Sequence, residues 1–350
     1  MQQDWRALLS AEGARFDGER VTDFGDPSGE LRAALHGDVR CDLSHYGLVR
    51  VCGDDAETFL QGQLTADLRE IAAGGSRLAA WCNPKGRMLA SMRLLRWADG
   101  FLLRLPRERL DAVLSRLRLY LLRARVTLAD VSDELPRIGL SGPAAAALLQ
   151  QLGMRLPEAV GQVLGTGPLA VVRVPGLHPR CEILGPGAAM ADTWRGLAAA
   201  RAVGADGWGL LETLSGVPEI HRETVEAFVP QMTNLELLGG VSFTKGCYTG
   251  QEVVARTQHL GKLKRRMYLA RLSEGPRPAP NAALLAGGEA GAAEVGRVVT
   301  AYPDGSGGWQ LLAVVQIAAV GSGAISVEGA GNSSLRFEAL PYPVPMPAVV

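Results

Sequence analysis

The segment K-G-C-Y-T-G-Q-E at residues 245–252 holds the side chains best suited to chemistry in this chain. Cys247 follows Lys245 by two positions and precedes Gly250 by three, and the next window, 253–259, has a helical pattern. We therefore expect Cys247 just outside a helix N-terminus, where exposed N–H groups, the positive dipole end and the charge of Lys245 favour a thiolate. A nucleophile, a redox thiol and a cluster ligand would each suit this setting.

Lysine is rare in this chain. Four of the 36 basic residues are lysines, at positions 85, 245, 262 and 264, and all the others are arginines. Because the two side chains are not interchangeable, lysines that survive around Cys247 suggest that a compact ammonium group is needed there. Chance clustering in so small a sample is the alternative.

The composition is that of a soluble globular protein, with 47% hydrophobic and 21% charged residues among 350. No apolar run reaches the roughly 18 residues that span a bilayer, and residues 1–10 lack the apolar core of a secretion signal. The five cysteines are odd in number and contain no C-x-x-C pair, which argues against a disulfide framework or a self-contained zinc or iron–sulfur site. We expect a cytoplasmic protein with reduced thiols and no membrane contact.

Positive charge is concentrated in one segment, although the net charge of the chain is zero. From Lys245 to Arg266 there are six basic side chains against Glu252 alone. Such a patch could bind phosphate, a polyanionic cofactor tail or RNA. A solvated basic face is the alternative.

The pattern along the chain predicts an α+β fold in three parts: residues 1–134, 135–262 and 263–350. The first two parts each contain a strand, a glycine and then a helix, around Gly53 and Gly142, which suggests two related α+β halves. Residues 107–123 predict an amphipathic helix with leucines at 110, 114, 117 and 121.

The C-terminal part predicts a small β-barrel. Short alternating strands are expected at residues 263–272, 296–302, 309–315, 325–327 and 334–339, whereas residues 273–296 are rich in Pro, Ala and Gly and predict a loop. No G-x-G-x-x-G after a strand and no Walker sequence occurs, so a bound dinucleotide or ATP is not expected.

Three segments together resemble the YgfZ family of folate-binding proteins, which are related to the T-protein (aminomethyltransferase) of the glycine cleavage system. They are residues 46–67 (Y-G-L-V-R-V-C-G-D-D-A-E-T-F-L-Q-G-Q-L-T-A-D), the N-P-K-G-R turn at 83–87, and residues 230–256, which contain the cysteine segment. The resemblance extends from about Asp42 to the C-terminus.

The resemblance implies a ring of three subdomains around a central hole that holds tetrahydrofolate or another folate. It also implies a role in maintaining iron–sulfur enzymes, including those that modify tRNA, with Cys247 as the family's hallmark cysteine. The aromatic residues of the family's folate site correspond to Trp208 and Tyr46. A folate ring could stack on either; for Trp208, ordinary core packing is the alternative.

The chain departs from T-protein at two acidic positions. Where T-proteins carry a paired aspartate, this chain has the turn Asn83–Arg87 without an acid. Where they carry a glutamate, this chain has Leu214, and the nearest acid is Glu212, which would face the same side if the segment were extended. Without these carboxylates no group is evident for proton transfer at the folate nitrogen, so aminomethyl transfer is not expected.

Three functions remain in competition. We favour a folate-binding accessory protein of iron–sulfur enzymes in which Cys247, aided by Lys245, supplies the chemistry or a transient ligand. The alternatives are a one-carbon transferase with an unusual site and an RNA-contacting adaptor that uses the segment from Lys245 to Arg266.

Overall fold

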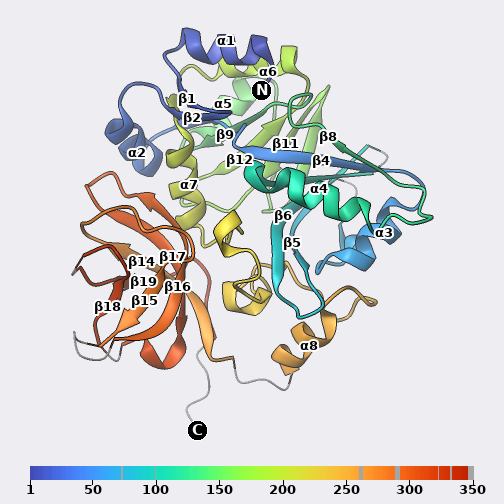
Figure 1. The fold of residues 1–350 in the computed structure, drawn as a ribbon. Helices are drawn as coiled ribbons and strands as arrows, with labels where there is room; N and C mark the ends of the chain where they lie inside the picture. The colour runs from blue at the N-terminus through green and yellow to red at the C-terminus, as the bar shows by residue number, and fades with distance from the viewer. Residues whose placement is uncertain are drawn as a thin grey trace. The chain divides into compact units, whose positions relative to one another are not determined.

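The computed structural model describes residues 1–71, 74–98, 100–259, 263–287, 292–321, 323–331 and 333–345. The chain forms two compact units, and each draws on several segments of the sequence. The first comprises Met1–Phe59, Arg69–Arg77 and Arg93–Glu212; the second comprises Leu60–Leu68, Leu78–Met92 and Thr213–Val350. The elements are labelled in Figure 1.

The first unit contains a six-stranded sheet that is antiparallel except for its β13–β3 edge pair. Its strands are, in order, β10 (Val163–Thr166), β11 (Leu169–Arg173), β12 (Arg180–Leu184), β9 (Arg137–Ser141), β3 (Val39–Asp42) and β13 (Arg201–Val203). Among the helices of the first unit are α1 (Gln3–Ala11), α2 (Pro27–His36), α5 (Ala145–Gln151), α6 (Gly187–Gly196) and α7 (Ala205–Leu214). The predicted mixture of helices and strands is confirmed.

The two faces of this sheet differ in chemistry because side chains alternate along each strand. One face carries Ile138, Leu140, Cys181 and Ile183, and it forms an apolar cluster with residues of α1, α5 and α6. The intervening positions of β9 and β12 place charged side chains on the opposite face: Arg137, Arg180 and Glu182. That face is where the first unit builds its candidate site.

A second sheet runs in the order β5–β6–β7–β4–β8. Its strands are β5 (Ser76–Cys82), β6 (Met88–Trp97), β7 (Gly100–Pro106), β4 (Tyr46–Cys52) and β8 (Thr127–Asp130). Gly53 ends β4 with φ 118°, and Gly142 follows β9 with φ 147°; each glycine precedes a helix, α3 (Ala56–Gln63) and α5. Both predicted strand–glycine–helix units are thus present.

The helix predicted at residues 107–123 is shorter than expected. A 3-10 turn at Arg107–Arg109 leads into α4 (Leu110–Arg118), which buries Leu110, Leu114 and Leu117. Beyond Arg118 the chain turns, and Leu122 is 92% exposed with φ 43°. The prediction extended the leucine period one turn too far.

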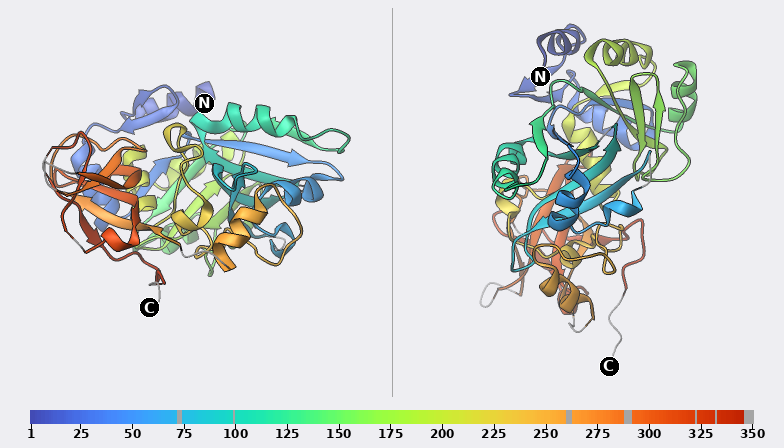
Figure 2. Two further views of the ribbon diagram at one scale, coloured as in Figure 1. Left: turned by 60° about the horizontal axis from the view of Figure 1, so that its bottom comes forward. Right: turned by 90° about the vertical axis from the view of Figure 1, so that its right-hand side faces the viewer.

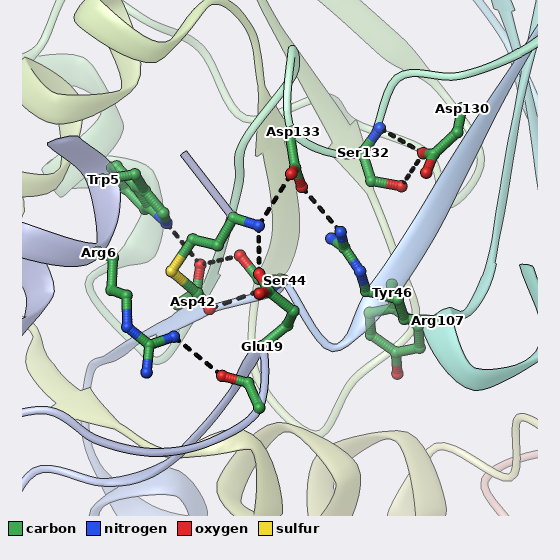
Figure 3. A network of polar contacts seen from close by, with 12 residues as sticks. Trp5, Arg6, Glu19, Asp42, Ser44, Tyr46, Arg107, Asp130, Ser132 and Asp133 are labelled. Atoms are coloured by element: carbon green, nitrogen blue, oxygen red, sulfur yellow. Dashed lines mark hydrogen bonds and ion pairs between the residues drawn. The ribbon is translucent and has the colours of Figure 1, made fainter. Parts of the chain in front are cut away.

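Within the first unit, helix α1 is joined to strand β3 by a buried carboxylate. Asp42 accepts hydrogen bonds from Trp5 Nε1 at 2.8 Å and from Ser44 Oγ at 2.8 Å (Figure 3). Burial raises the pKa of Asp42, while these donors oppose the shift. Tyr46 lies two residues beyond Ser44, and its ring points away from this network.

The C-terminal part of the second unit is a curled six-stranded sheet, a half-barrel shown in orange and red in Figures 1 and 2. Its strands are, in order, β18 (Ile325–Val327), β15 (Ala283–Ala286), β16 (Ala293–Pro303), β17 (Trp309–Gln316), β14 (Arg265–Leu272) and β19 (Arg336–Glu338). The five predicted strands are confirmed. The predicted loop at 273–296 is wrong in part, because β15 lies inside it.

Candidate functional site

The cysteine segment lies in the second unit and leads into α8 (Gln251–His259). The helix therefore starts directly after Gly250, as the sequence predicted. Cys247 is exposed four residues before the first helical residue. The thiol is open to solvent, whereas the residues on either side of it are fixed by contacts of their own.

One of these contacts is a close approach of two backbones. Gly250 has φ 83°, and a Cβ there would lie 2.4 Å from Asn83 O. Gly86 has φ 69°, and a Cβ there would lie 3.0 Å from Val253 Cβ. Each position favours glycine for its left-handed backbone and for its lack of a side chain. The cysteine segment therefore packs directly on the N-P-K-G-R turn (Figure 1).

Asn83 holds that turn together. Its Oδ1 accepts hydrogen bonds from the backbone N–H groups of Lys85 at 2.9 Å and Arg87 at 3.0 Å. Its Nδ2 donates to Glu226 Oε1 at 3.0 Å. The turn itself lacks an acid, as the sequence indicated, but the fold brings the carboxylate of Glu226 to it from far along the chain. Sequence spacing gave no signal for this acid.

Lys245 has a buried environment that the sequence did not suggest. Its side chain is 5% exposed, and Nζ donates hydrogen bonds to Leu64 O and Ala66 O, both at 2.7 Å. The same ammonium lies 5.3 Å from the ring centroid of Tyr248. Lys245 thus fixes the cysteine segment to the backbone at residues 64–66. Its predicted electrostatic effect on Cys247 stays a prediction.

The other basic residues of the predicted patch have different surroundings. Arg266 Nη1 forms an ion pair with the carboxylate of Glu236, whose side chain is 5% exposed. The patch is therefore less available to a polyanion than the sequence implied, because two of its six cations already have internal partners. Of the rest, Arg256 and Lys264 are exposed, Arg265 is half-buried and Lys262 lies outside the described residues.

The predicted aromatic residues lie in the first unit and are fully enclosed. Trp208, on α7, is 0% exposed, and Tyr46, on β4, is 2% exposed. The Arg180 guanidinium lies 3.8 Å from the Trp208 ring centroid, and the Arg104 guanidinium lies 4.0 Å from that of Tyr46. A Cβ on Gly139 would lie 2.4 Å from Trp208 Cζ3, so the missing side chain makes room for the indole.

These stacked arginines belong to a buried cluster of charges. Arg104 Nη2 and Arg180 Nη2 lie 3.4 and 3.2 Å from Glu212 Oε1, and Arg104 Nε lies 3.3 Å from Glu182 Oε1. Two further arginines are equally buried, with Arg93 directly opposite Arg104 across β6 and β7. Every member is at most 4% exposed: Arg93, Arg104, Arg137, Arg180, Glu182 and Glu212.

The electrostatics of the cluster favour a further anion or acceptor. Four arginines face two glutamates and, beside Arg137, the buried carboxylate of Asp42, which leaves an excess of one positive formal charge. Burial lowers the pKa of Arg93, and it lowers that of Arg137 to about 10. Burial would raise the pKa of Glu212, but the neighbouring guanidinium groups hold it below its usual value. Since buried charges are stable only when paired, an anionic or acceptor-rich ligand would complete this cluster.

Several donors in and beside the cluster are buried and make no hydrogen bond within the described part of the chain. They are Arg93 Nε and Nη2, Arg137 Nε and Nη1, and Trp208 Nε1. Such donors are expensive to bury unsatisfied, and clusters of them mark ligand sites or bound water. Donors of this kind are suited to hydrogen-bonding either bound water or the acceptor atoms of a polar ligand.

Sequence reasoning missed this cluster. Each arginine stands in an apolar strand where alternation could equally place it in solvent, so the available signal was the recurrence of single arginines inside such strands. The sequence indicated Glu212 as the acid nearest Leu214, on the condition that the segment is extended. The segment is the helix α7 and is not extended, so Glu212 and Leu214 do not share one side by strand alternation.

The remaining thiols differ from Cys247 in their burial. Cys41, Cys82 and Cys181 are buried. Burial raises the pKa of Cys41 well above its usual range and raises the pKa values of Cys82 and Cys181 to about 12. Cys52 is half-buried. The described residues contain no group of three or more His, Cys, Asp or Glu side chains arranged to hold a metal, and no helix among them could cross a membrane.

Comparison with known proteins identifies relatives of this chain. Residues 19–160 match the family model described as GCVT N-terminal domain. The "tRNA-modifying protein YgfZ" of Edwardsiella ictaluri is 35% identical over 298 residues, covering 84% of this chain and 89% of that protein. The protein of the same name from Colwellia psychrerythraea is 35% identical over 227 residues, covering 65% of this chain and 69% of that protein.

A solved structure shares the fold. The glycine cleavage system aminomethyltransferase T of Bartonella henselae superimposes with a TM-score of 0.78 at 20% sequence identity, over 94% of each chain. At this identity the likeness concerns the fold alone.

The contacts of Lys245 predict a contrast in stability. Lys245→Met should reduce the free energy of unfolding by about 2–5 kcal/mol, because two buried carbonyl oxygens lose their donor. Lys85→Met, at an exposed lysine of the same unit, and Cys247→Ser should each change it by less than about 0.5 kcal/mol. Urea denaturation measures all three. Equal stability of the two lysine variants would show that the buried contact contributes nothing.

Exposure predicts the order in which the thiols react. Cys247 should be alkylated by iodoacetamide before Cys41, Cys82 and Cys181, and faster than free cysteine near neutral pH if its setting favours the thiolate. Peptide mass spectrometry after partial labelling of the native protein, at several pH values, measures these rates. A rate for Cys247 no greater than that of free cysteine would disprove the thiolate hypothesis.

Proposed function

Because the chain belongs to the YgfZ family, we propose that it binds a reduced folate, tetrahydrofolate or a close relative, in its first unit at Trp208 and Tyr46. The observation that carries this proposal is the buried charge cluster around both rings. A folate combines an aromatic ring system rich in acceptors with anionic carboxylates, which matches stacking surfaces, unused donors and an excess of positive charge.

The residues present fit such a ligand. Trp208 Nε1 and the unused guanidinium N–H groups of Arg93 and Arg137 are donors, and the acceptor atoms and carboxylates of a folate would satisfy them. Glu212, held ionised by its arginine neighbours, could in turn accept N–H groups of the ligand. When bound, the folate would supply a carrier for one-carbon groups, and the protein's residues would bind and orient it.

Ring stacking would require a local rearrangement. The Arg180 guanidinium occupies a place over the Trp208 ring at 3.8 Å, so a ligand ring stacked on that face would displace it. Arg180 also pairs with Glu212, and the displaced guanidinium would keep that partner within reach. Part of the binding energy would be offset by the lost cation–π contact.

The wider role that we propose is that of an accessory protein for iron–sulfur enzymes, including enzymes of tRNA modification. The names of the relatives support the link to tRNA modification. Cys247 would provide a nucleophile, a redox thiol or a transient cluster ligand, since it is exposed on a fixed segment. Lys245 would act by holding that segment in place.

Aminomethyl transfer should be absent or negligible. Asn83 stands where related enzymes carry an acid, and its side chain is already used in holding the turn and in bonding Glu226. We expect no turnover with the lipoyl carrier protein of glycine cleavage at rates of about 1 per second or more, which are ordinary for an enzyme. A coupled assay with the loaded carrier tests this. Turnover at such rates would favour the one-carbon transferase instead.

Substitution of Trp208 tests the folate site. Trp208→Ala should weaken tetrahydrofolate binding by roughly 1–3 kcal/mol if a ring packs against it. Trp208→Phe should keep most of the affinity if stacking dominates, and should lose it if the indole N–H is the main contact. Calorimetry gives the affinities, and tryptophan fluorescence quenching reports contact with the ring.

A second tryptophan provides a matched control. Trp194, on α6, is also 0% exposed, has an arginine (Arg40) over its ring at 4.5 Å and has a buried Nε1 without a partner in the described chain. It belongs to the apolar cluster of the opposite sheet face. Trp194→Phe should therefore leave folate affinity unchanged. If the wild type binds no folate at millimolar concentration, the folate-binding proposal is excluded. The RNA-contacting adaptor then becomes the favoured function.

A further inference from the structure

We propose that the second unit contains a separate binding pocket for a phosphate-bearing ligand. A cavity of about 300 Å³ opens between the N-P-K-G-R turn, the segment 225–228 and the half-barrel. Three guanidinium side chains line it, from Arg87, Arg265 and Arg297, against the single carboxylate of Glu226. None of these residues belongs to the folate site proposed above.

The lining charges favour an anion. Three arginines and one glutamate leave an excess of two positive formal charges on the pocket wall. A phosphate monoester or pyrophosphate carries close to two negative charges or more near neutral pH, whereas one carboxylate carries one. Guanidinium groups also match phosphate oxygens in geometry, since their N–H groups donate in parallel pairs. Charge and geometry therefore favour phosphate over a single carboxylate.

Arg265 and Arg87 retain donors for such a ligand, whereas Arg297 would have to exchange a partner for it. Arg265 makes no ion pair or side-chain hydrogen bond with any described residue. Arg87 uses Nη1 for Ala227 O at 2.7 Å. Arg297 uses all three nitrogens: Nε and Nη2 donate to Glu294 at 3.0 and 2.8 Å, and Nη1 donates to Asn281 O at 3.2 Å. The Glu294 side chain is 38% exposed. An ion pair this exposed is weak, so a phosphate can compete for that guanidinium.

The pocket wall is also held in an unusual backbone conformation. Glu226 has φ 62°, which is uncommon for a residue with a side chain. Backbone bonds from Glu226 N to Met88 O at 2.9 Å and from Met88 N to Phe228 O at 2.8 Å hold it there. Such strain is found most often at functional sites. Here it holds the Glu226 side chain on the pocket wall, where its carboxylate accepts from Asn83.

The pocket is connected to the cysteine segment through one turn. Arg87 lines the pocket, and Asn83, four residues earlier, bonds Glu226 on the pocket wall. The same turn contacts Gly250. A phosphate bound by Arg87 would therefore brace the turn that supports Cys247.

Calorimetric titration of the full chain with pyrophosphate tests the pocket. Arg265→Ala should weaken binding by about tenfold or more, because one charge-assisted contact is lost. Lys264→Ala is the matched control. It removes the same charge at the neighbouring position, where the side chain is exposed and does not line the cavity, and it should leave binding within about twofold. Trp208→Ala should have no effect, which separates this site from the folate site.

The outcomes are distinct. Equal losses in Arg265→Ala and Lys264→Ala, or no pyrophosphate binding at millimolar concentration, would overturn the proposal. Citrate binding as tightly as pyrophosphate would overturn the preference for phosphate. A short single-stranded RNA that competes with pyrophosphate, and loses affinity in Arg265→Ala, would identify a phosphodiester backbone as the source. Pyrophosphate binding without such competition would identify a small phosphorylated molecule.

Discussion

The structure of the first unit depends on burying four guanidinium groups with fewer carboxylates than guanidinium groups beside them. Taking charges out of water is costly, and attraction between partners must compensate for the lost hydration. The carboxylate of Glu212 provides this attraction for both Arg104 and Arg180, because α7 places it next to their guanidinium groups. The two predicted folate-site rings lie under the same arginines. The contacts that stabilise the unit are thus the ones that the proposed folate site would use.

The second unit uses a buried cation in a different way. The ammonium of Lys245 lies between two backbone carbonyls at 2.7 Å each, a space suited to a compact point charge rather than a planar guanidinium. This explains why lysine persists there in a chain that otherwise uses arginine. The same explanation does not extend to Lys85 and Lys264, which are exposed. For these two, the clustering of lysines noted in the sequence has no structural cause.

Features that depend on a few neighbouring residues could be predicted from the sequence. The start of α8 after Gly250, the exposed setting of Cys247 and the short strands of the half-barrel each follow from caps, glycines and alternation over a few residues. The charge cluster could not be found in this way. Its arginines come from strands far apart in sequence, and an arginine inside an apolar strand is buried or solvated according to which face the tertiary fold covers. The helix predicted at 107–123 was too long for a related reason, because the spacing of leucines does not show where the packing of a helix ends.

The chemistry open to Cys247 is limited by the same architecture. Its neighbours are fixed, through Lys245 on one side and the Gly250 contact with Asn83 on the other, so the thiol is presented without needing a rearrangement of the chain. A stable zinc or iron–sulfur site takes about four protein ligands, and the described residues offer no cluster that could supply the others. In the proposed role, a partner molecule would supply the remaining ligands of a cluster bound at Cys247. An exposed thiol on a rigid support is suited to such a shared and transient contact.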